Sequence, residues 1–494
     1  MKASIRLSPD KTIAAIDDRL YSSFIEHMGR AVYTGIFEPE HPTADEAGLR
    51  RDVLELIKPL NISHIRYPGG NFLSGYRWED GIGPKEERPV RPELAWQALE
   101  PNLFGTDEFM DFCDKAGCSP MIGVNLGTGT PQSAADLVEY CNFPGGTHYS
   151  ELRRKNGHDK PYGVKLWCLG NEMDGPWQIC AKSAEEYAAI ARESGKMMKL
   201  IDPSIELVAC GSSYRAMPSF GTWERTVLDG CWEQIDYLSL HQYYQCNDGD
   251  LPTFLARSVE MEGFIHEVAD ICREIKEKKS SDKDVYLSFD EWNVWYHWQL
   301  EKKDSPMWTV GRRVEEEEYN FADALVVGCM MNTLINNADT VKIACLAQLV
   351  NALAAIMTEP LGPAWAQSIY YPFAYASRFG RGTALKSETD CESYGCSISE
   401  AVPYLDSAAV LSPDRQEMSI FIVNRSLDEA AECEISMPES FHITEHLAMA
   451  GFDPYAANSA ENAPIRPAAY SLPEDGRTVT LPAFSWNMIR CKVN

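Results

Sequence analysis

The sequence is short of positive charge. It has 45 Lys and Arg residues against 73 Asp and Glu residues, which gives a formal net charge of −28. So much negative charge repels phosphate backbones and anionic lipids, so we expect no nucleic-acid partner and no membrane partner. The negative charge is compatible with a neutral ligand such as a sugar. It is equally compatible with a role in solubility alone, because acidic residues keep proteins soluble.

Long apolar runs and export signals are missing as well. No segment approaches the roughly 18 apolar residues of a membrane-spanning helix. The N-terminal segment 1–6 has neither the apolar stretch nor the cleavage site of a signal peptide. The 15 cysteines are scattered and odd in number, unlike a secreted disulfide framework. These features together predict a cytoplasmic protein.

Several catalytic and cofactor motifs are absent. No G-x-G-x-x-G follows the first expected strand, no G-x-S-x-G occurs, and the loop 127–130 lacks the lysine of a phosphate loop. No metal-ligand spacing is present, so the sequence predicts no metal and no other cofactor. A weaker alternative stays open, because His27, His241 and His297 each follow an expected strand. Such a trio would fit a metal-dependent sugar isomerase.

What the sequence does have is a regular alternation of short apolar runs with helix-length segments. Eight strands are expected, and they end near Glu26, Arg66, Asn125, Asn171, Ala209, His241, Glu291 and Ala344. Strand–helix alternation implies a parallel sheet, and eight repeats imply a closed (β/α)8 TIM barrel, an α/β fold. The alternative is an open doubly wound sheet, which the missing dinucleotide motif disfavours.

The pattern changes after about residue 380. Short β-rich runs separated by turn residues follow, at 408–411, 418–423, 433–435, 478–481 and 486–493. They predict an antiparallel, jelly-roll-like β-sandwich. We therefore expect a catalytic barrel over 15–380 and a β-sandwich over 381–494. The N-terminal segment 1–14, with its strand at 3–7, is expected to join the sandwich.

Two glutamates end apolar strands of the expected barrel. Glu172 follows the run 164–169, and Glu291 closes the run that starts at Val285. Barrel enzymes react at the carboxyl ends of their strands, and a buried carboxyl group has a raised pKa suited to a general acid. A carboxyl pair about 5–5.5 Å apart would retain configuration at a sugar carbon, and a wider pair would invert it. The alternative for Glu172 is a helix cap.

Other polar residues are expected beside this pair. His241 and Tyr243 share one strand face, although a satisfied core histidine is the alternative for His241. Arg66 can hold a carboxylate in its charged form. Asp290 should point to the other face from Glu291, which makes it structural. Tryptophans that could stack on sugar rings are Trp78, Trp96, Trp177, Trp292, Trp295 and Trp298, with burial in the core as the alternative for each. The acidic run 315–318 is expected to be solvated.

With these residues in view, the chain resembles the α-L-arabinofuranosidases of glycoside hydrolase family 51. The resemblance runs nearly end to end. The segments that carry it are Ser23–Tyr33, Arg66–Asn71, Leu94–Gln97, Gly170–Gln178, Asp290–Asn293 and Leu346–Asn351. The stretch 295–299 beside Glu291 varies within the family. The resemblance therefore does not predict which residues form the leaving-group side of the pocket.

The resemblance implies a specific activity and site. Glu172 would be the acid/base and Glu291 the nucleophile of a retaining, exo-acting enzyme. Its substrate would be an arabinose-containing oligosaccharide, arabinan or arabinoxylan. Family members need no metal, and many are homo-hexamers. The residues that would bind the arabinofuranosyl ring or position the two glutamates are Glu26, Arg66, Asn71, Asn171, His241, Tyr243 and Gln348, and Trp96 in the matching segment joins them.

Two further functions stay open from the sequence. One is another retaining glycosidase on the same barrel, such as an endo-glucanase or a xylosidase. The other is a carbohydrate-binding protein without activity, which the presence of both glutamates disfavours.

Overall fold

The structure is a computed structural model that describes residues 1–296 and 306–493. Its centre is a closed barrel in which each strand pairs in parallel with the next along the chain, as the alternation predicted. The eight strands are β3 (Ser22–Phe24), β4 (His64–Tyr67), β7 (Ser119–Val124), β8 (Leu166–Leu169), β9 (Glu206–Ala209), β10 (Tyr237–Tyr244), β11 (Tyr286–Val294) and β12 (Val341–Ala347).

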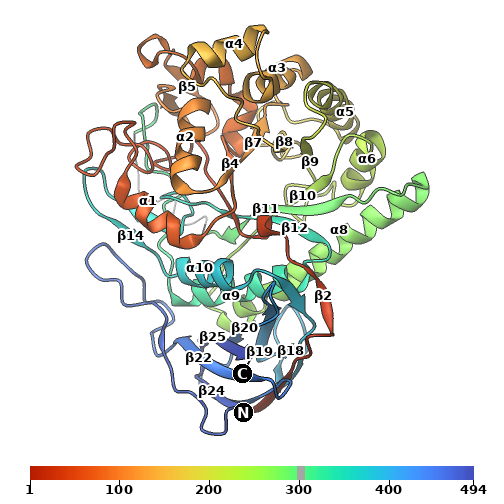
Figure 1. Cartoon of the computed structure of the whole chain (residues 1–494), viewed down its shortest axis with the longest axis vertical. Coiled ribbons are helices and arrows are strands. Elements are labelled where there is room, and N and C mark those ends of the chain that lie inside the picture. Colours follow the sequence, from red (N-terminus) through yellow and green to blue (C-terminus); the bar gives the residue numbers. More distant parts are fainter. Residues whose placement is uncertain (297–305, 494) are drawn as a thin grey trace.

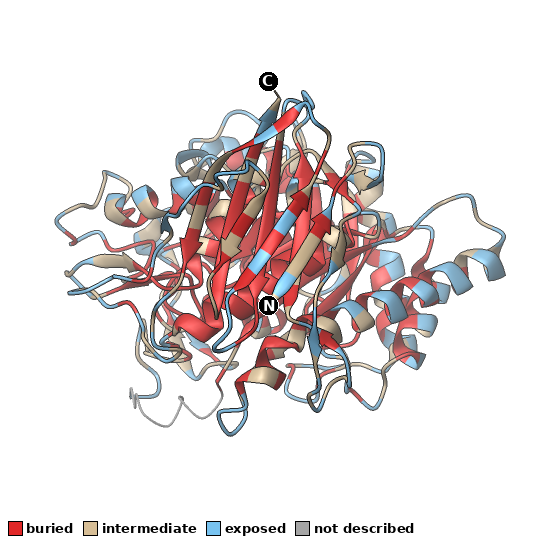
Figure 2. Ribbon diagram, turned by 90° about the horizontal axis from the view of Figure 1, so that it is seen from below, coloured by how far each residue is buried: buried red, intermediate tan, exposed pale blue. Residues whose placement is uncertain are grey.

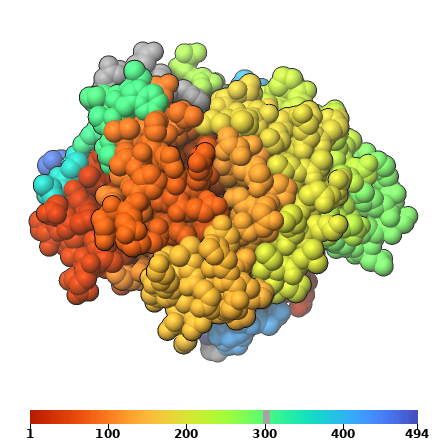
Figure 3. Space-filling view, turned by 90° about the horizontal axis from the view of Figure 1, so that it is seen from above, coloured from red at the N-terminus to blue at the C-terminus, as the bar shows by residue number. Residues whose placement is uncertain are grey.

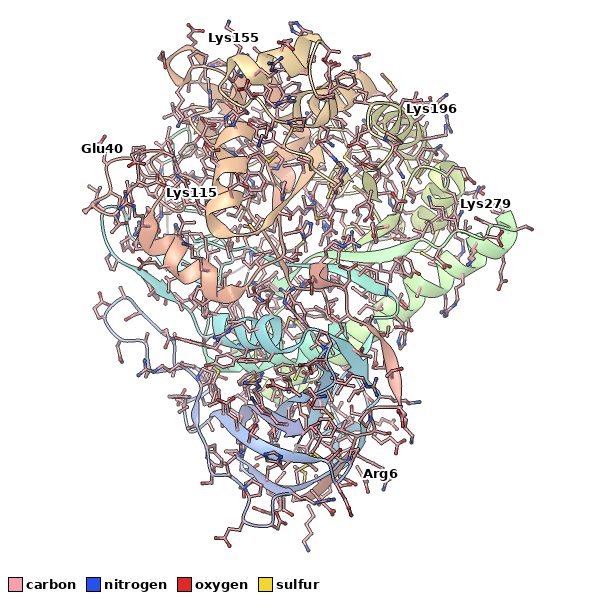
Figure 4. All side chains as sticks on the ribbon, in the orientation of Figure 1. Arg6, Glu40, Lys115, Lys155, Lys196 and Lys279 are labelled. Atoms are coloured by element: carbon pink, nitrogen blue, oxygen red, sulfur yellow. The ribbon has the colours of Figure 1, made fainter. Side chains whose placement is uncertain are left out.

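Helices surround the barrel. They are α1 (Arg51–Ile57), α2 (Thr106–Ala116), α3 (Pro131–Asn142), α4 (His148–Lys155), α5 (Ala184–Ile201), α6 (Thr222–Cys231), α7 (Leu251–Leu255), α8 (Arg257–Lys279), α9 (Phe321–Asn336) and α10 (Tyr370–Phe379). Their polar faces point outward, as the labelled Lys155, Lys196 and Lys279 show at the rim of the molecule (Figure 4). Ser183 and Glu186 form the predicted capping box at the start of α5.

The helix α9 joins the barrel to the second half of the fold. All fifteen residues from Phe321 to Ile335 are buried, so this helix is covered on all sides. It packs against α8 of the barrel and against β19, β20 and β25 of the sheets below. In Figure 1, α9 and α10 lie between the barrel and the C-terminal sheets. The two halves therefore share a continuous hydrophobic core.

The C-terminal sheets form the predicted sandwich. One sheet has the order β2-β15-β19-β20-β25-β22-β23 and the other the order β16-β1-β21-β24. A second hydrophobic core, which includes Ile5, Ile420 and Ile435, lies between them. Figure 2 shows buried and exposed residues alternating along the outer strands. The bounds are β1 (Lys2–Arg6), β2 (Thr12–Ala15), β15 (Thr383–Leu385), β16 (Glu388–Asp390), β19 (Leu405–Leu411), β20 (Glu417–Asn424), β21 (Ala431–Ser436), β22 (Phe441–Met449), β23 (Ala468–Ala469), β24 (Thr478–Leu481) and β25 (Ser485–Val493).

The N-terminal strand belongs to this sandwich. β1 pairs antiparallel with β16 and parallel with β21, so one pair of an otherwise antiparallel sandwich is parallel. Both chain ends lie together at the sandwich end of the molecule (Figure 1). These contacts support our proposal that 1–14 joins 381–494, with 15–380 as the catalytic part.

Loops at the carboxyl ends of the barrel strands shape the site. The hairpin β5 (Arg91–Glu93) and β6 (Ala98–Glu100) follows β4, and the hairpin β13 (Ile356–Thr358) and β14 (Ala364–Ala366) follows β12. A small hairpin, β17 (Ser393–Tyr394) and β18 (Val402–Pro403), precedes β19. Figure 3 shows the barrel end of the molecule, where segments from the first half of the chain lie side by side. Among the described residues, no helix is both long and apolar enough to span a bilayer.

Candidate active site

The two predicted glutamates meet at one mouth of the barrel, with a histidine between them. Glu172 lies in the loop after β8 with a left-handed φ of 44°, a conformation that turns the chain sharply at the strand end. One carboxylate oxygen of Glu172, one of Glu291 and one ring nitrogen of His241 all lie within 4.8 Å of one another. His241 Nδ1 is 3.0 Å from Glu172 Oε1 and 3.6 Å from Glu291 Oε2. The three groups therefore form one cluster.

Asp290 is part of the same cluster, contrary to the prediction that it faces away. Its carboxylate lies 3.3 Å from His241 Nε2 and 3.5 Å from Arg66 Nε, and its side chain is buried. The reason is a bulge in β11. Ser288 pairs with Ser239 of β10 and Glu291 pairs with His241, so β11 has one residue more than β10 between these two pairs. The pairing of β11 with β12 shifts in register at the same place. An extra residue breaks the alternation of side chains, so both Asp290 and Glu291 point into the barrel.

Neighbouring strands supply the remaining partners of Glu291. Arg66 on β4 donates from Nη1 to Glu291 Oε1 at 2.7 Å and from Nη2 to Asn171 Oδ1 at 2.6 Å. Tyr243 on β10 donates its hydroxyl to Glu291 Oε2 at 2.9 Å. The predicted shared face of His241 and Tyr243 is confirmed, because both contact the glutamate pair. Both carboxylate oxygens of Glu291 thus accept a hydrogen bond.

Burial and neighbouring charges set the protonation of the cluster. Burial raises the pKa of Glu172, and the negative charge of Glu291 acts in the same direction, against the hydrogen bond from His241. Burial alone would lower the pKa of His241, but Glu291, Asp290 and Glu172 together raise it to about 10. For Asp290, burial is outweighed by Arg66 and His241, which hold its pKa below the ordinary value. The cluster thus raises the pKa of both Glu172 and His241, each through its buried neighbours.

A second set of predicted residues surrounds Glu26, in the loop after β3. Its Oε1 accepts hydrogen bonds from Phe72 N at 2.8 Å and from Trp96 Nε1 at 2.9 Å. Gln348 Oε1 accepts from Glu26 N at 2.9 Å. Burial raises the pKa of Glu26 to about 8, and the charge of Glu291 adds to this rise, which places the two carboxyl groups in one electrostatic environment.

Local backbone geometry makes room for Glu26. A Cβ atom at Gly70 would overlap the Glu26 carboxylate, so the close approach requires glycine there. Asn71 opens the short 3-10 helix η3 (Asn71–Gly75), directly before the Phe72 amide that binds Glu26. All ten predicted site residues therefore lie at the same end of the barrel.

Some of the predicted tryptophans line the site as an aromatic wall, and others are buried in the hydrophobic core. Trp177 donates from Nε1 to Glu172 Oε2 at 2.8 Å and is 44% exposed. Trp295 packs edge-on against Tyr243, with ring centroids 5.1 Å apart. Trp78 and Trp292 are buried in the core. Trp298 lies outside the described residues. Trp96, Trp177 and Trp295 are thus the three described tryptophans of the predicted set that contact site residues.

The histidines give no support to the alternative metal trio. Both ring nitrogens of His27 are engaged at 2.8 Å, by Glu100 and by the Tyr67 hydroxyl. His297 lies outside the described residues. Glu172, His241 and Glu291 have the donor types and proximity to hold a metal ion. The surrounding carboxyl groups raise the pKa of His241 to about 10, so a metal ion bound to its ring would have to displace a proton.

In the acidic run 315–318, three glutamates are buried and only Glu318 is exposed. Glu315, Glu316 and Glu317 are each less than a tenth exposed. Glu316 forms a buried ion pair with Arg30 at 2.7 Å, and Glu315 Oε2 accepts from Trp295 Nε1 at 2.6 Å. The prediction of a solvated run was therefore wrong for Glu315, Glu316 and Glu317, because partners outside the run, Arg30 and Trp295, stabilise the burial of Glu316 and Glu315. Glu315 is therefore a support of the aromatic wall.

Comparisons with known proteins identify the family. Two family models match: the α-L-arabinofuranosidase 1 domain over residues 56–259 and the α-L-arabinofuranosidase C-terminal domain over residues 290–485. A relative from Bacillus subtilis, the intracellular exo-α-(1→5)-L-arabinofuranosidase 1, is 50% identical over 99% of both chains. An exo-α-(1→6)-L-arabinofuranosidase from Bifidobacterium longum is 46% identical over 98% of this chain and 96% of its own.

Solved structures show the same architecture. A family 51 α-L-arabinofuranosidase from Bifidobacterium longum superposes with a TM-score of 0.94, at 41% identity over 99% of both chains. An α-L-arabinofuranosidase from Thermotoga maritima, solved as an arabinose complex, has a TM-score of 0.90 at 34% identity over all of both chains. The chain described here belongs to the α-L-arabinofuranosidases of glycoside hydrolase family 51.

Proposed function

We propose that the protein releases terminal α-L-arabinofuranose from arabinose-containing oligosaccharides with retention of configuration. The observation that carries the proposal is the approach of the Glu172 and Glu291 oxygens to within 4.8 Å beside His241. This proximity of one oxygen from each carboxylate supports the roughly 5–5.5 Å spacing of retaining glycosidases over the roughly 6.5–9.5 Å spacing of inverting ones. The names of the relatives support the exo mode and the sugar.

The chemistry then follows in two steps. Glu172 gives its proton to the glycosidic oxygen while Glu291 attacks the anomeric carbon, which breaks the C–O bond and leaves a glycosyl ester on Glu291. Glu172, now ionised, takes a proton from water, and the resulting hydroxide oxygen displaces Glu291. Arg66 and Tyr243 orient the Glu291 carboxylate in both steps through the hydrogen bonds to its two oxygens.

The cellular compartment and the oligomeric state of the enzyme are part of the proposal as well. All 15 cysteines are free thiols, which fits a reducing compartment, and the relative from Bacillus subtilis is named intracellular. We therefore place the enzyme in the cytoplasm. The homo-hexamer that the family resemblance implies stays a prediction. The linkage also stays open, since the relatives named above include both (1→5) and (1→6) enzymes.

The stereochemistry of the first product tests the function. Proton NMR during hydrolysis of an α-L-arabinofuranosyl disaccharide should show α-L-arabinofuranose first, before mutarotation. A first product with the β configuration would contradict retention. A panel of aryl glycosides separates the other candidates: cleavage of the β-xyloside or β-glucoside without the α-L-arabinofuranoside would replace this function with a xylosidase or glucanase.

Asp290 should matter for activity through its contacts with His241 and Arg66. Asp290→Asn removes the charge that helps to keep His241 cationic and that pairs with Arg66. We expect kcat/KM for an aryl α-L-arabinofuranoside to fall about 10²-fold. The matched control is Asp107→Asn, a buried carboxylate on α2 bound by two tyrosine hydroxyls. Equal losses in the two variants would mean that Asp290 acts only through stability.

A further inference from the structure

Glu315 is a buried carboxylate beside the site that the proposed chemistry does not use. Only 6% of the residue is exposed. One oxygen, Oε2, accepts a hydrogen bond from Trp295 Nε1 at 2.6 Å. The other oxygen, Oε1, has no hydrogen-bond partner among the residues that the structure describes, and protein atoms do not enclose it fully. An unpaired carboxylate oxygen at a buried position is costly, and a ligand that donates a hydrogen bond to it would remove that cost.

The backbone at Glu315 is strained and firmly held. Its φ of 53° lies in the left-handed region, which favours glycine or asparagine over glutamate. Its carbonyl oxygen accepts from Leu353 N at 2.8 Å, and the carbonyl oxygen of Leu353 accepts from Gln348 N at 2.8 Å. Strained backbone of this kind gathers at functional sites. The position is therefore tied to the loop after β12 that carries the predicted binding residue Gln348.

Two aromatic side chains separate Glu315 from the proposed nucleophile. The Trp295 ring packs edge-on against Tyr243, with centroids 5.1 Å apart, and the Tyr243 hydroxyl donates to Glu291. The charge of Glu291 contributes to the raised pKa of Glu26. For Glu315, by contrast, burial raises the pKa to about 7 against the hydrogen bond from Trp295. Glu315 thus lies outside the cluster of carboxyl groups around Glu291.

The segment that carries Glu315 also reaches the other side of the site. Val314 packs against the same small hydrophobic cluster as Trp96, and Trp96 Nε1 donates to Glu26. Residues 314 and 315 therefore link Trp96 with Trp295, two tryptophans that contact different site residues.

This position identifies the kind of group that Glu315 can bind. The terminal sugar of an exo-acting enzyme occupies the space beside the nucleophile, so a side chain two aromatic rings away meets the next part of the substrate. Carboxylates accept hydrogen bonds from hydroxyl groups, and these charge-assisted bonds are stronger than bonds between neutral groups. A sugar leaving group offers such hydroxyls, whereas a simple alkyl leaving group does not.

We propose that Glu315 is a specificity-determining residue, in which Oε2 fixes the Trp295 ring and Oε1 accepts a hydrogen bond from one hydroxyl group of the leaving-group sugar. The inference rests on the proposed function, because it assumes that the terminal arabinose reacts at Glu291. It goes beyond that function by giving the enzyme a polar means of choosing its leaving group. A leaving group with a hydroxyl at the matching position is preferred over one without it.

The test compares kcat/KM for a linear α-L-arabinofuranosyl disaccharide with kcat/KM for methyl α-L-arabinofuranoside, whose leaving group has no further hydroxyl. We expect Glu315→Gln to lower the disaccharide-to-methyl ratio about tenfold relative to wild type, since the amide can still accept from Trp295 but the charged acceptor is lost. Glu318→Gln is the matched control, because Glu318 is the exposed glutamate of the same run, and it should keep the ratio within about twofold.

Disaccharides that lack one leaving-group hydroxyl at a time locate the contact. Removal of the hydroxyl that Glu315 binds should lower kcat/KM about tenfold in wild type and less than about twofold in Glu315→Gln. An unchanged disaccharide-to-methyl ratio in folded Glu315→Gln would overturn the role of Glu315 alone. A wild-type enzyme that is indifferent to every leaving-group hydroxyl would also overturn it, even if Glu315→Gln fails to fold. A wild-type enzyme that releases arabinose from neither substrate would instead overturn the proposed function.

Discussion

Glu291→Ala is expected to lower kcat for an aryl α-L-arabinofuranoside by about 10⁴-fold or more, because the covalent intermediate has no other acceptor. Glu291 is the one carboxylate that both Arg66 and Tyr243 orient through hydrogen bonds. Asp290, its neighbour in the chain, is engaged by Arg66 and His241 on the other side of the bulge. Asp290 therefore has the wrong position to replace it.

Azide rescue distinguishes loss of a nucleophile from loss of the fold. In Glu291→Ala, azide can enter the space of the missing carboxylate and attack the anomeric carbon, so the product should be the β-L-arabinofuranosyl azide. An unfolded variant gives no rescue. An azide product of α configuration in this variant would assign the nucleophile to a different residue and would reverse the roles proposed for the two glutamates.

The barrel and most of the site followed from one regularity of the sequence. Each buried strand ends in polar residues, and parallel strands in a barrel bring all those ends to one rim. That rule alone places Glu172, His241 and Glu291 together, as the structure confirms. Glu26 also stands at an expected strand end, but the proposed binding role of Gln348 needed the family resemblance, since the last strand was expected to end near Ala344.

The features that escaped prediction depend on partners far away in the chain. The bulge that turns Asp290 inward exists because β11 must match the registers of both β10 and β12. The burial of Glu316 depends on Arg30, nearly 300 positions earlier. β22 was missed because its end, 445–449, is rich in residues that favour helix, and pairing with β25 overrides that local preference.

Glu172→Ala should show a loss that depends on the leaving group. The variant cannot protonate the glycosidic oxygen, so we expect kcat/KM for an arabino-oligosaccharide to fall about 10³- to 10⁴-fold. An aryl substrate such as the 2,4-dinitrophenyl arabinofuranoside departs without a proton and should lose less than about tenfold in the step that forms the glycosyl ester. A burst of dinitrophenol measures that step, because hydrolysis of the ester still lacks its general base.

The pH profile of the wild-type enzyme supplies an independent check on the same residue. A general acid must be protonated, so kcat/KM should fall as pH rises through the pKa of Glu172 in the free enzyme. Since burial and the charge of Glu291 raise that pKa above the ordinary 4.5, the alkaline limb should lie above the range of an exposed glutamate. The limb should appear for the arabino-oligosaccharide, whose leaving group needs the proton, and it should be lost from the residual activity of Glu172→Ala on that substrate. An alkaline limb that persists unchanged in Glu172→Ala would mean that another group causes the limb. Equal losses of kcat/KM on the oligosaccharide and the dinitrophenyl substrate would mean that Glu172 is not the proton donor, since loss of a proton donor affects a poor leaving group more than a good one.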